Sequence, residues 1–396
     1  MSNQGIWPGY KQTEVGVIPE DWEARPLPEM AWFQEGPGLR NWQFTRSGMK
    51  VINVTNLENG FLNLDRTERH ISLEEFSKMY MHFAVDDTDI VMASSGNSYG
   101  KSSIVRARDL PLVMNTSVIR FKPLKSCDYA YLWILLNSDL FKEQIDLMIT
   151  GGAQPNFGPY HLRRIEVPAP PLPEQRAIAG ALSDADGLIA ALEGVIAKKR
   201  DLKQAAMQQL LTGKTRLPGF SGDWEVKRLG ELCSMKSGEG ITAKGIDDHS
   251  PFPCYGGNGL RGYVGRYTHE GTYCLIGRVG ALCGNLLEVT GRFFASEHAI
   301  VVEAFDSTDV SWLTRAMGTL SLNRRAESSA QPVLTVSKLL LLEIPAPPSK
   351  AEQAAIAEVL SDMDADLAAL EARAAKARAV KQGMMQQLLT GKVRLV

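Results

Sequence analysis

The chain has 396 residues, 44% of them hydrophobic, and a formal net charge of −2 at pH 7. This length allows two or three domains with cores of ordinary size. The near-neutral charge gives no global signature of a nucleic-acid-binding protein, so any DNA-binding face must be local. No apolar run reaches the ~20 residues needed to span a bilayer. The first residues lack a signal-peptide pattern, and we expect a cytoplasmic protein without a membrane partner.

The cysteines and histidines give no sign of a metal site or a disulfide framework. The five cysteines are odd in number and form no C-x-x-C pair, so we expect reduced thiols. The six histidines are scattered without H-x-x-x-H or H-x-H spacing. We therefore expect no metal ligands in this chain.

The first 166 residues form a segment with mixed α/β patterning. Short runs at Met49–Val54, Ile90–Ala93 and Ser117–Phe121 are rich in Val, Ile and Met and favour strands. Tyr129–Ile149 is apolar with helical spacing and predicts one core helix. Residues 34–44, QEGPGLRNWQF, combine Gly with Arg, Asn and Trp, which is typical of a loop on the surface or in a binding site.

Residues 96–103, GNSYGKSS, resemble a phosphate-binding loop without matching it. The P-loop needs four residues between its two glycines, whereas three separate Gly96 from Gly100. We expect a glycine-shaped turn between strands, or a DNA-facing loop that uses Lys101. A nucleotide site is disfavoured.

A long amphipathic helix follows, from Glu174 to about Arg216. Apolar residues at alternating steps of four and three line one face, as in a coiled-coil seam. Pro173 fits the first turn, and Gly213 fits a left-handed cap at the other end. The expected helix has roughly 38 residues and is about 57 Å long. On the opposite face, glycines recur every seven residues at 180, 187 and 194, which indicates an exposed surface or a close partner contact.

The second globular segment, residues 218–344, repeats parts of the first. Tyr273–Ile276 and Ala299–Val302 favour strands, and residues 252–267, FPCYGGNGLRGYVGRY, favour a loop. Asp223–Gly238 matches Asp21–Gly36 at 6 of 16 positions. Gly280 and Gly284 recur with the spacing of the earlier glycine pair. The two segments thus share a framework.

The last segment repeats the long helix. Residues 352–394 match residues 174–216 at 27 of 43 positions without a gap, and PAPP precedes both copies. Ser349 with Glu352 is a capping-box pattern, and Gly391 takes the place of the first copy's capping glycine. Both copies end in QQLLTGK, whose lysine suits either the negative end of the helix dipole or a contact with phosphate or a partner. Such duplication indicates an architecture of globular unit, helix, globular unit, helix.

Catalytic motifs are not found. The sequence has no Asn-Pro-Pro-Tyr-type motif for adenine methylation, no Gly-rich loop suited to S-adenosylmethionine, and no clustered acidic residues of a metal-dependent nuclease. Together these absences favour a binding module over an enzyme. Two other hypotheses stay open, an autonomous DNA-modifying enzyme and a coiled-coil scaffold that does not bind nucleic acid.

The two repeats resemble the specificity subunit of type I restriction–modification systems. The resemblance is carried by VPAPPLPEQRAIAGAL and IPAPPSKAEQAAIAEVL, by both QQLLTGK ends, by the lead-ins GGAQPNFGPYHLRRIEVPAPP and SSAQPVLTVSKLLLLEIPAPP, and by FPCYGGNGLRGYVGRY. It covers nearly the whole chain. The second copy reads PPSKAEQ and departs from P-L-P-E-Q there.

The resemblance implies an α+β fold with a pseudo-twofold internal repeat. Two mixed α/β target recognition domains, at 1–166 and 218–344, would be separated by spacer helices at 167–217 and 345–396 that pair as an antiparallel coiled coil. Each domain would read half of a split double-stranded DNA site. Two methyltransferase subunits would dock on the helices, and restriction–translocase subunits would join them. The chain itself would be non-catalytic and bind no cofactor, with S-adenosylmethionine, ATP and Mg²⁺ on its partners. A related methylating system that uses the same type of subunit is an alternative.

Candidate contact residues follow from these expectations. Base reading needs Arg, Lys, Asn, Gln, Ser or Thr at groove edges. The candidates in the first domain are Arg40, Asn41, Gln43, Arg46, Asn97, Tyr99, Lys101, Gln154 and Asn156, and those in the second are Lys236, Lys244, Tyr255, Asn258, Arg261, Tyr263, Arg278 and Gln331. The helix-pairing candidates are Ile178, Leu182, Ile189, Leu192, Ile196, Ile356, Leu360, Leu367 and Leu370.

The helices would also act as a ruler. A spacer of about one DNA turn is expected, and four residues added near Asp186 would lengthen the first helix by about 6 Å. The two recognition segments differ strongly, so the half-sites should differ in sequence. The recognised bases do not follow from the sequence.

Overall fold

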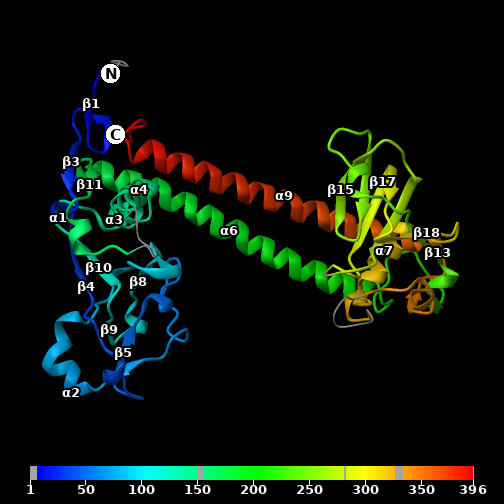
Figure 1. Cartoon of the computed structure of the whole chain (residues 1–396), viewed down its shortest axis with the longest axis horizontal. Helices are drawn as coiled ribbons and strands as arrows, with labels where there is room; N and C mark the ends of the chain where they lie inside the picture. Colours follow the sequence, from blue (N-terminus) through cyan, green and yellow to red (C-terminus); the bar gives the residue numbers. More distant parts are fainter. Residues whose placement is uncertain (1–6, 150–155, 281, 326–332, 396) are drawn as a thin grey trace. The chain divides into compact units, whose positions relative to one another are not determined.

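The computed structural model describes residues 7–149, 156–280, 282–325 and 333–395. The chain divides into two compact units (Figure 1). Unit 1 comprises Met1–Ala191 and Ala375–Val396, and unit 2 comprises Leu192–Ala374. Each unit therefore contains a globular part together with segments of both long helices.

The two long helices have the predicted length. Helix α6 spans Leu172–Leu210 and α9 spans Lys350–Leu388, with 39 residues each. The Ser349 hydroxyl accepts a hydrogen bond from the Glu352 backbone N–H at 3.3 Å, as the capping pattern predicts. Gly213 and Gly391, just beyond the helices, have φ of 71° and 66°, so the predicted left-handed conformation is confirmed.

The helices pair antiparallel within each unit. In unit 1, Asp186 accepts from Lys381 at 2.6 Å. In unit 2, Lys199 contacts Asp366, and Lys203, one turn further along α6, contacts Asp364. Partner numbers fall in α9 as they rise in α6, which is the pattern of an antiparallel pair.

Most predicted seam residues are buried, and several of them lie in the globular cores. Ile178 and Leu182 pack in the core of unit 1 beside Leu388, and Ile356 and Leu360 pack in the core of unit 2. Leu192, Ile196 and Leu367 are also buried, whereas Ile189 and Leu370 are half-buried. The helix ends are thus built into the globular parts and fixed there by apolar burial.

Unit 1 is built on a four-stranded antiparallel sheet. Its order is β4-β10-β7-β8, formed by Ala31–Glu35, Val118–Pro123, Ile90–Ala93 and Ser102–Ile104. A three-stranded sheet, β6-β5-β9, is formed by His70–Ile71, Met49–Ile52 and Leu112–Met114. The predicted strands in this segment are confirmed. Two further pairs are β1 (Tyr10–Thr13) with β2 (Gly16–Pro19) and β3 (Glu23–Pro26) with β11 (Glu166–Ala169).

Short helices complete unit 1. They are α1 (Leu27–Met30), α2 (Leu73–Glu75), α3 (Tyr129–Leu136), α4 (Asp139–Met148) and α5 (Pro159–Leu162). The single helix expected over 129–149 is wrong, because the chain breaks at Asn137 and Ser138. The Ser138 hydroxyl accepts from the Phe141 N–H and starts α4, so a local cap outweighs the continuous apolar pattern.

Unit 2 is built on a six-stranded sheet of order β13-β18-β16-β17-β14-β15. These strands span Cys233–Ser237, Ala299–Ala304, His269–Gly277, Leu286–Ala295, Phe252–Gly256 and Gly259–Val264. Strand β12 (Glu225–Arg228) pairs with β19 (Glu343–Ala346), and helices α7 (Val310–Gly318) and α8 (Val336–Leu339) complete the unit.

The loop expected over 252–267 is instead a hairpin of β14 and β15. Cys254, Val264 and Phe294 form a small buried cluster beneath it, so apolar burial stabilises a glycine-rich segment as strands. Gly262 has φ of 141°, and a Cβ there would lie 2.6 Å from the Ile246 side chain. All five cysteines are buried free thiols, as expected.

The two units share a framework and differ in what is inserted into it. The order β4-β10-β7-β8 in unit 1 corresponds to β13-β18-β16-β17 in unit 2. In both units, the strand that contains the first proline of the PAPP motif pairs with the strand that begins at the glutamate of the DWE motif. These pairs are β11 with β3 and β19 with β12. The chain between β4 and β7 of unit 1 contains β5 and β6. The corresponding chain between β13 and β16 of unit 2 contains the β14–β15 hairpin. The predicted internal repeat is thus a repeat of tertiary structure.

Candidate nucleic-acid interface

Each sheet ends in a face built from the same backbone hydrogen bonds. In unit 1 this strand-end face consists of residues 35–36, 94–101, 115–117 and 156–158. In unit 2 it consists of residues 237–239, 278–280, 282–284, 296–298 and 333–334. Ser94 N–H donates to Ser117 O at 2.9 Å, and Arg278 N–H donates to His298 O at 2.9 Å. Phe157 and Leu334 donate in turn to the carbonyls of Ser94 and Arg278, both at 3.0 Å.

The paired glycines shape a turn at each strand-end face. Gly96 and Gly100 have φ of 68° and 76°, and Gly280 and Gly284 have φ of 84° and 86°. These values favour glycine, and the N–H of the second glycine bonds back to the preceding strand in both units. The glycine-shaped turn between strands is confirmed.

Several candidate residues of unit 1 gather at its strand-end face. Asn97 and Asn156 are exposed there, and Lys101 lies 3.8 Å from Glu58. The Tyr99 hydroxyl donates to Asp146 at 2.7 Å, and burial together with this bond raises the pKa of Tyr99. Gln154 lies outside the described residues.

The remaining candidates of unit 1 follow β4. Arg40, Asn41 and Arg46 are exposed, whereas Gln43 is 6% exposed. The Gln43 amide donates to Glu75 and Tyr80 and accepts from the Arg40 N–H at 2.7 Å. Its polar atoms therefore hold the 40–43 turn in place from inside unit 1.

The candidates of unit 2 lie on β13, in the turn Ala243–Gly245 that follows it, on the β14–β15 hairpin and after β16. Lys236, Lys244, Asn258 and Arg261 are exposed, and Tyr255, Tyr263 and Arg278 are half-buried. A Cβ on Gly257 would lie 2.9 Å from His298 O, so the hairpin turn approaches the strand-end face closely. Gln331 lies outside the described residues.

A second constellation, not foreseen from the sequence, joins the end of one long helix to the start of the other in unit 1. Arg394 forms two hydrogen bonds with Glu174, at 2.6 and 2.8 Å, and two with Asp21, at 2.9 and 2.7 Å. Trp22 Nε1 donates to the same Glu174 carboxylate at 2.8 Å. Glu174 is 2% exposed, so this C-terminal latch provides partners for a buried carboxylate.

Unit 2 contains the same latch. Arg216 contacts Glu352 at 2.9 and 2.5 Å, and Trp224 Nε1 donates to Glu352 at 3.3 Å. The next residue also has the same role in both units, because Gln175 accepts from the Asp128 N–H at 2.8 Å and Gln353 accepts from the Asp309 N–H at 2.7 Å. The sequence did contain a signal for this latch, because its Trp, Glu, Gln and Arg residues are identical in the two repeats.

The latch of unit 1 predicts a loss of stability in acid. Burial acts to raise the pKa of Glu174, but hydrogen bonds from Arg394 and Trp22 outweigh it and hold the pKa below its usual value. The hydrogen bond from Arg394 likewise lowers the pKa of Asp21. Groups with lowered folded-state pKa values stabilise the fold above their unfolded values of about 4 and lose this effect as pH falls further. We expect the protection of the backbone amides of residues 19–26 against hydrogen exchange to fall below about pH 4. Arg394→Ala should weaken this dependence on pH.

Comparison with known proteins identifies the family of this fold. The type I restriction modification DNA specificity domain matches residues 19–199 and 221–378. The chain belongs to this family. Both matches cover one globular segment together with part of the following long helix, as the repeat does.

Two relatives of the family show the extent of the similarity. The EcoprrI specificity subunit of Escherichia coli is 42% identical over 142 residues, which are 35% of each chain. The MjaVIII specificity subunit of Methanocaldococcus jannaschii is 30% identical over 216 residues, which are 54% of this chain and 50% of the relative. The matched part thus spans between about a third and a half of these relatives.

Solved structures share the fold over nearly the whole chain. The S subunit of a type I restriction–modification system from M. genitalium has a TM-score of 0.61 at 19% identity, covering 94% of this chain and 96% of that one. A chain from a study of complex assembly and conformational transition of the type I R-M system also has a TM-score of 0.61, at 16% identity and with coverage of 95% and 99%. The predicted fold class is confirmed. No helix among the described residues is long and apolar enough to cross a membrane.

Proposed function

We propose that this chain is the DNA-specificity subunit of a type I restriction–modification enzyme and that each unit reads one half of a bipartite site. The observation that carries the proposal is the pair of strand-end faces. They share strand order, glycine turns and backbone hydrogen bonds, yet their side chains differ. Equal frameworks with unlike side chains suit two half-sites of unlike sequence, because base edges are read by side chains.

Exposed basic side chains in both units support contact with DNA phosphates. Arg40 and Arg46 are exposed in unit 1, and Lys236, Lys244 and Arg261 are exposed in unit 2. Each phosphate contact releases counterions and strengthens binding at low salt. With a net charge of only −2, the chain relies on partner subunits for much of its affinity for DNA.

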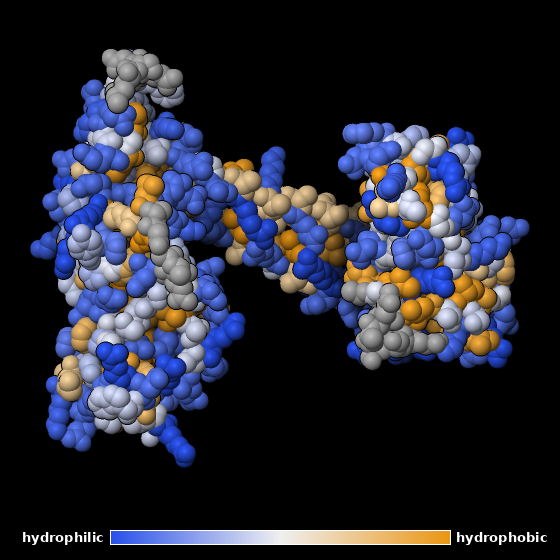
Figure 2. All heavy atoms as spheres, in the orientation of Figure 1, coloured by the Kyte–Doolittle hydropathy of each residue, from blue (hydrophilic) through white to orange (hydrophobic). Residues whose placement is uncertain are grey.

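The long helices supply the docking surface for two methyltransferase subunits. Figure 2 shows apolar side chains exposed along the helix pair, and Leu188, Val195 and Leu202 on α6 are about half exposed at every seventh residue. A Cβ added to Gly180, Gly187 or Gly194 would meet nothing within 4 Å, so a partner helix has room to approach. Heptad spacing of apolar residues is suited to such helix packing.

The chemistry belongs to the partners in this proposal. Adenine methylation with S-adenosylmethionine is assigned to the methyltransferase subunits, and ATP- and Mg²⁺-dependent translocation and cleavage are assigned to the restriction subunits. The chain contributes recognition and geometry and binds none of these cofactors.

The proposal is tested by copurifying the chain with its methyltransferase subunits and measuring binding to double-stranded DNA. We expect a stable complex whose gel shift requires two short sequences at a fixed spacing. Methylome sequencing of cells with and without the gene should show the same split motif. A complex that binds all sequences equally, at any salt concentration, would refute the proposal.

A further inference from the structure

The two strand-end faces differ in charge at two corresponding places, where one unit has a charged side chain and the other has a serine. Glu35 is the last residue of β4, and its pairing with Ile119 corresponds to the pairing of Ser237 with Ile300 in unit 2. Ser94 and Arg278 correspond in the same way, because each follows the third strand and makes the same two backbone hydrogen bonds. Unit 1 thus has Glu35 and Ser94 where unit 2 has Ser237 and Arg278.

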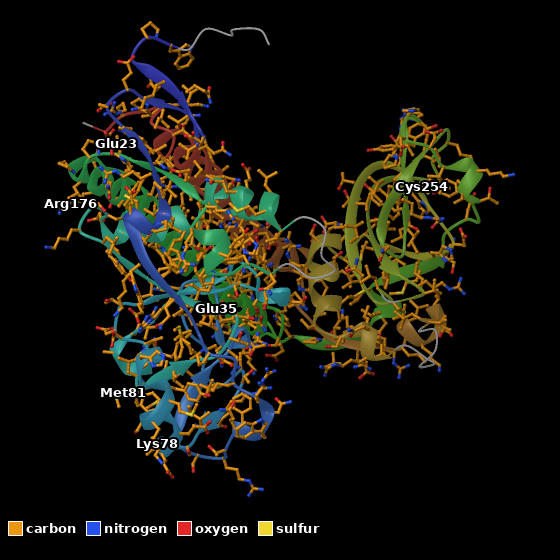
Figure 3. The ribbon with its side chains drawn as sticks, turned by 60° about the vertical axis from the view of Figure 1, so that its left-hand side comes forward. Glu23, Glu35, Lys78, Met81, Arg176 and Cys254 are labelled. Carbon is orange, nitrogen blue, oxygen red and sulfur yellow. The ribbon has the colours of Figure 1, made fainter. Side chains whose placement is uncertain are left out.

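Glu35 is a carboxylate without a cation beside it. No ion pair joins it to any described Lys, Arg or His, and the Ser117 backbone acts to lower its pKa less strongly than burial raises it. A Cβ on Gly158 would lie 3.4 Å from Glu35 Oε2, which places the carboxylate at the strand-end face. Figure 3 shows Glu35 between the part of unit 1 that carries Glu23 and the part that carries Lys78. Burial raises the pKa of Glu35, so the carboxylate is already partly stripped of water.

Ser94 belongs to the same strand-end face as Glu35, and its N–H donates to Ser117 O. It is fully buried, and its hydroxyl has no hydrogen-bond partner among the described residues. A buried polar atom without a partner costs free energy unless a ligand or water completes it. Ser94 therefore leaves one hydrogen-bonding group beneath the unit 1 face that no described side chain uses.

Arg278 provides the opposite chemistry in unit 2. Its Nη1 donates to Ser237 Oγ at 3.2 Å, and no described carboxylate lies within ion-pair distance of it. Glu239 and Glu297, the acidic residues within this face, contact Arg266 and His298 instead. No described residue accepts from the remaining guanidinium donors, whose planar geometry suits a pair of acceptors.

We propose that Glu35 and Arg278 determine base specificity at corresponding positions of the two half-sites. Glu35 accepts a hydrogen bond from a base amino group in the major groove, N4 of cytosine or N6 of adenine. Arg278 donates to O6 and N7 of guanine. The inference rests on the proposed DNA-reading function and adds the chemistry of one position in each half-site.

The discrimination follows from the base edges. Guanine and thymine present only acceptor atoms to a carboxylate in the major groove, so Glu35 rejects them by repulsion and by the loss of a hydrogen bond. Guanine presents two acceptors that match the paired donors of Arg278, whereas the cytosine amino group repels them. At the position that it reads, each unit therefore determines which of the two DNA strands carries the base with an amino group, cytosine or adenine.

The test selects bound sequences from a randomised duplex library with the complex of the full chain and its methyltransferase subunits. Glu35→Gln should reduce the preference for amino bases over keto bases, on the order of 10- to 100-fold, to a few-fold at one position of one half-site. Arg278→Gln should move the preference at one position of the other half-site from guanine toward adenine. Glu29→Gln on α1 and Arg292→Gln, whose side chain pairs with Glu270, should leave both half-sites unchanged.

A DNA-side measurement makes the test independent of folding. With the unaltered complex, 7-deazaguanine at the position assigned to Arg278 should weaken binding about tenfold. Sequence-specific binding that none of these changes alters would overturn the assignment of Glu35 and Arg278 while leaving the proposed function intact. An unaltered complex without any sequence preference would overturn both.

Discussion

Replacement of Arg394 by alanine is expected to loosen unit 1 selectively. The substitution leaves Glu174, which is 2% exposed, without its charged partner, and it also removes the partner of Asp21. Removing one member of a buried ion pair costs about 3–5 kcal/mol. Because the Arg394 side chain is 26% exposed, we expect the lower end of this range, about 3 kcal/mol. The expected result is faster amide exchange in 10–26 and in the first turns of α6.

The same experiment in unit 2 supplies a matched comparison. Arg216→Ala should accelerate exchange around Trp224 and Glu352 and leave 10–26 unchanged. Lys381→Ala removes the more exposed ion pair with Asp186 and should change stability by at most about 1 kcal/mol. Equal effects of Arg394→Ala and Lys381→Ala would show that the latch does not hold unit 1 together.

Lengthening both long helices by one heptad is expected to widen the DNA spacer by about three base pairs. Seven residues add about 10.5 Å, and they preserve the phase of the apolar seam on both sides of the insertion. The insertions belong after Asp186 in α6 and before Lys381 in α9, because these two residues pair. The sequences of the half-sites should stay the same, since the strand-end faces and both latches are untouched. Methylome sequencing would measure the spacer.

A single insertion is the matched control for this experiment. Four residues in α6 alone add about 6 Å but rotate the following residues by about 40°. Such a shift would break the pairing of Lys199 with Asp366 and of Lys203 with Asp364. We therefore expect the single insertion to destabilise the helix pair. A folded protein with both heptads and an unchanged spacer would refute the ruler.

The residues of the strand-end faces could be predicted only in part from the sequence. The order of the strands in each sheet decides which residues lie there, and that order is set by contacts between distant segments. The glycine turns and the exposed residues Asn97, Asn156 and Asn258 follow from local composition. The burial of Gln43 does not, because Glu75 and Tyr80, which bind it, follow more than 30 residues later. Glu35, which we propose contacts a base, was not among the predicted residues for the same reason, because nothing near it in sequence reveals its place beside Ser117.

By itself, the sequence determined the elements whose signals are local or repeated. Heptad spacing and a 43-residue copy determined the long helices, and short β-branched runs determined the central strands. Only the tertiary structure decided where Tyr129–Ile149 breaks, that residues 252–264 form a hairpin, and that Arg394 binds Glu174, 220 residues away. The physical reason is that periodicity reports which face of an element is buried. Hydrogen bonds and ion pairs between distant segments depend on the packing that brings those faces together.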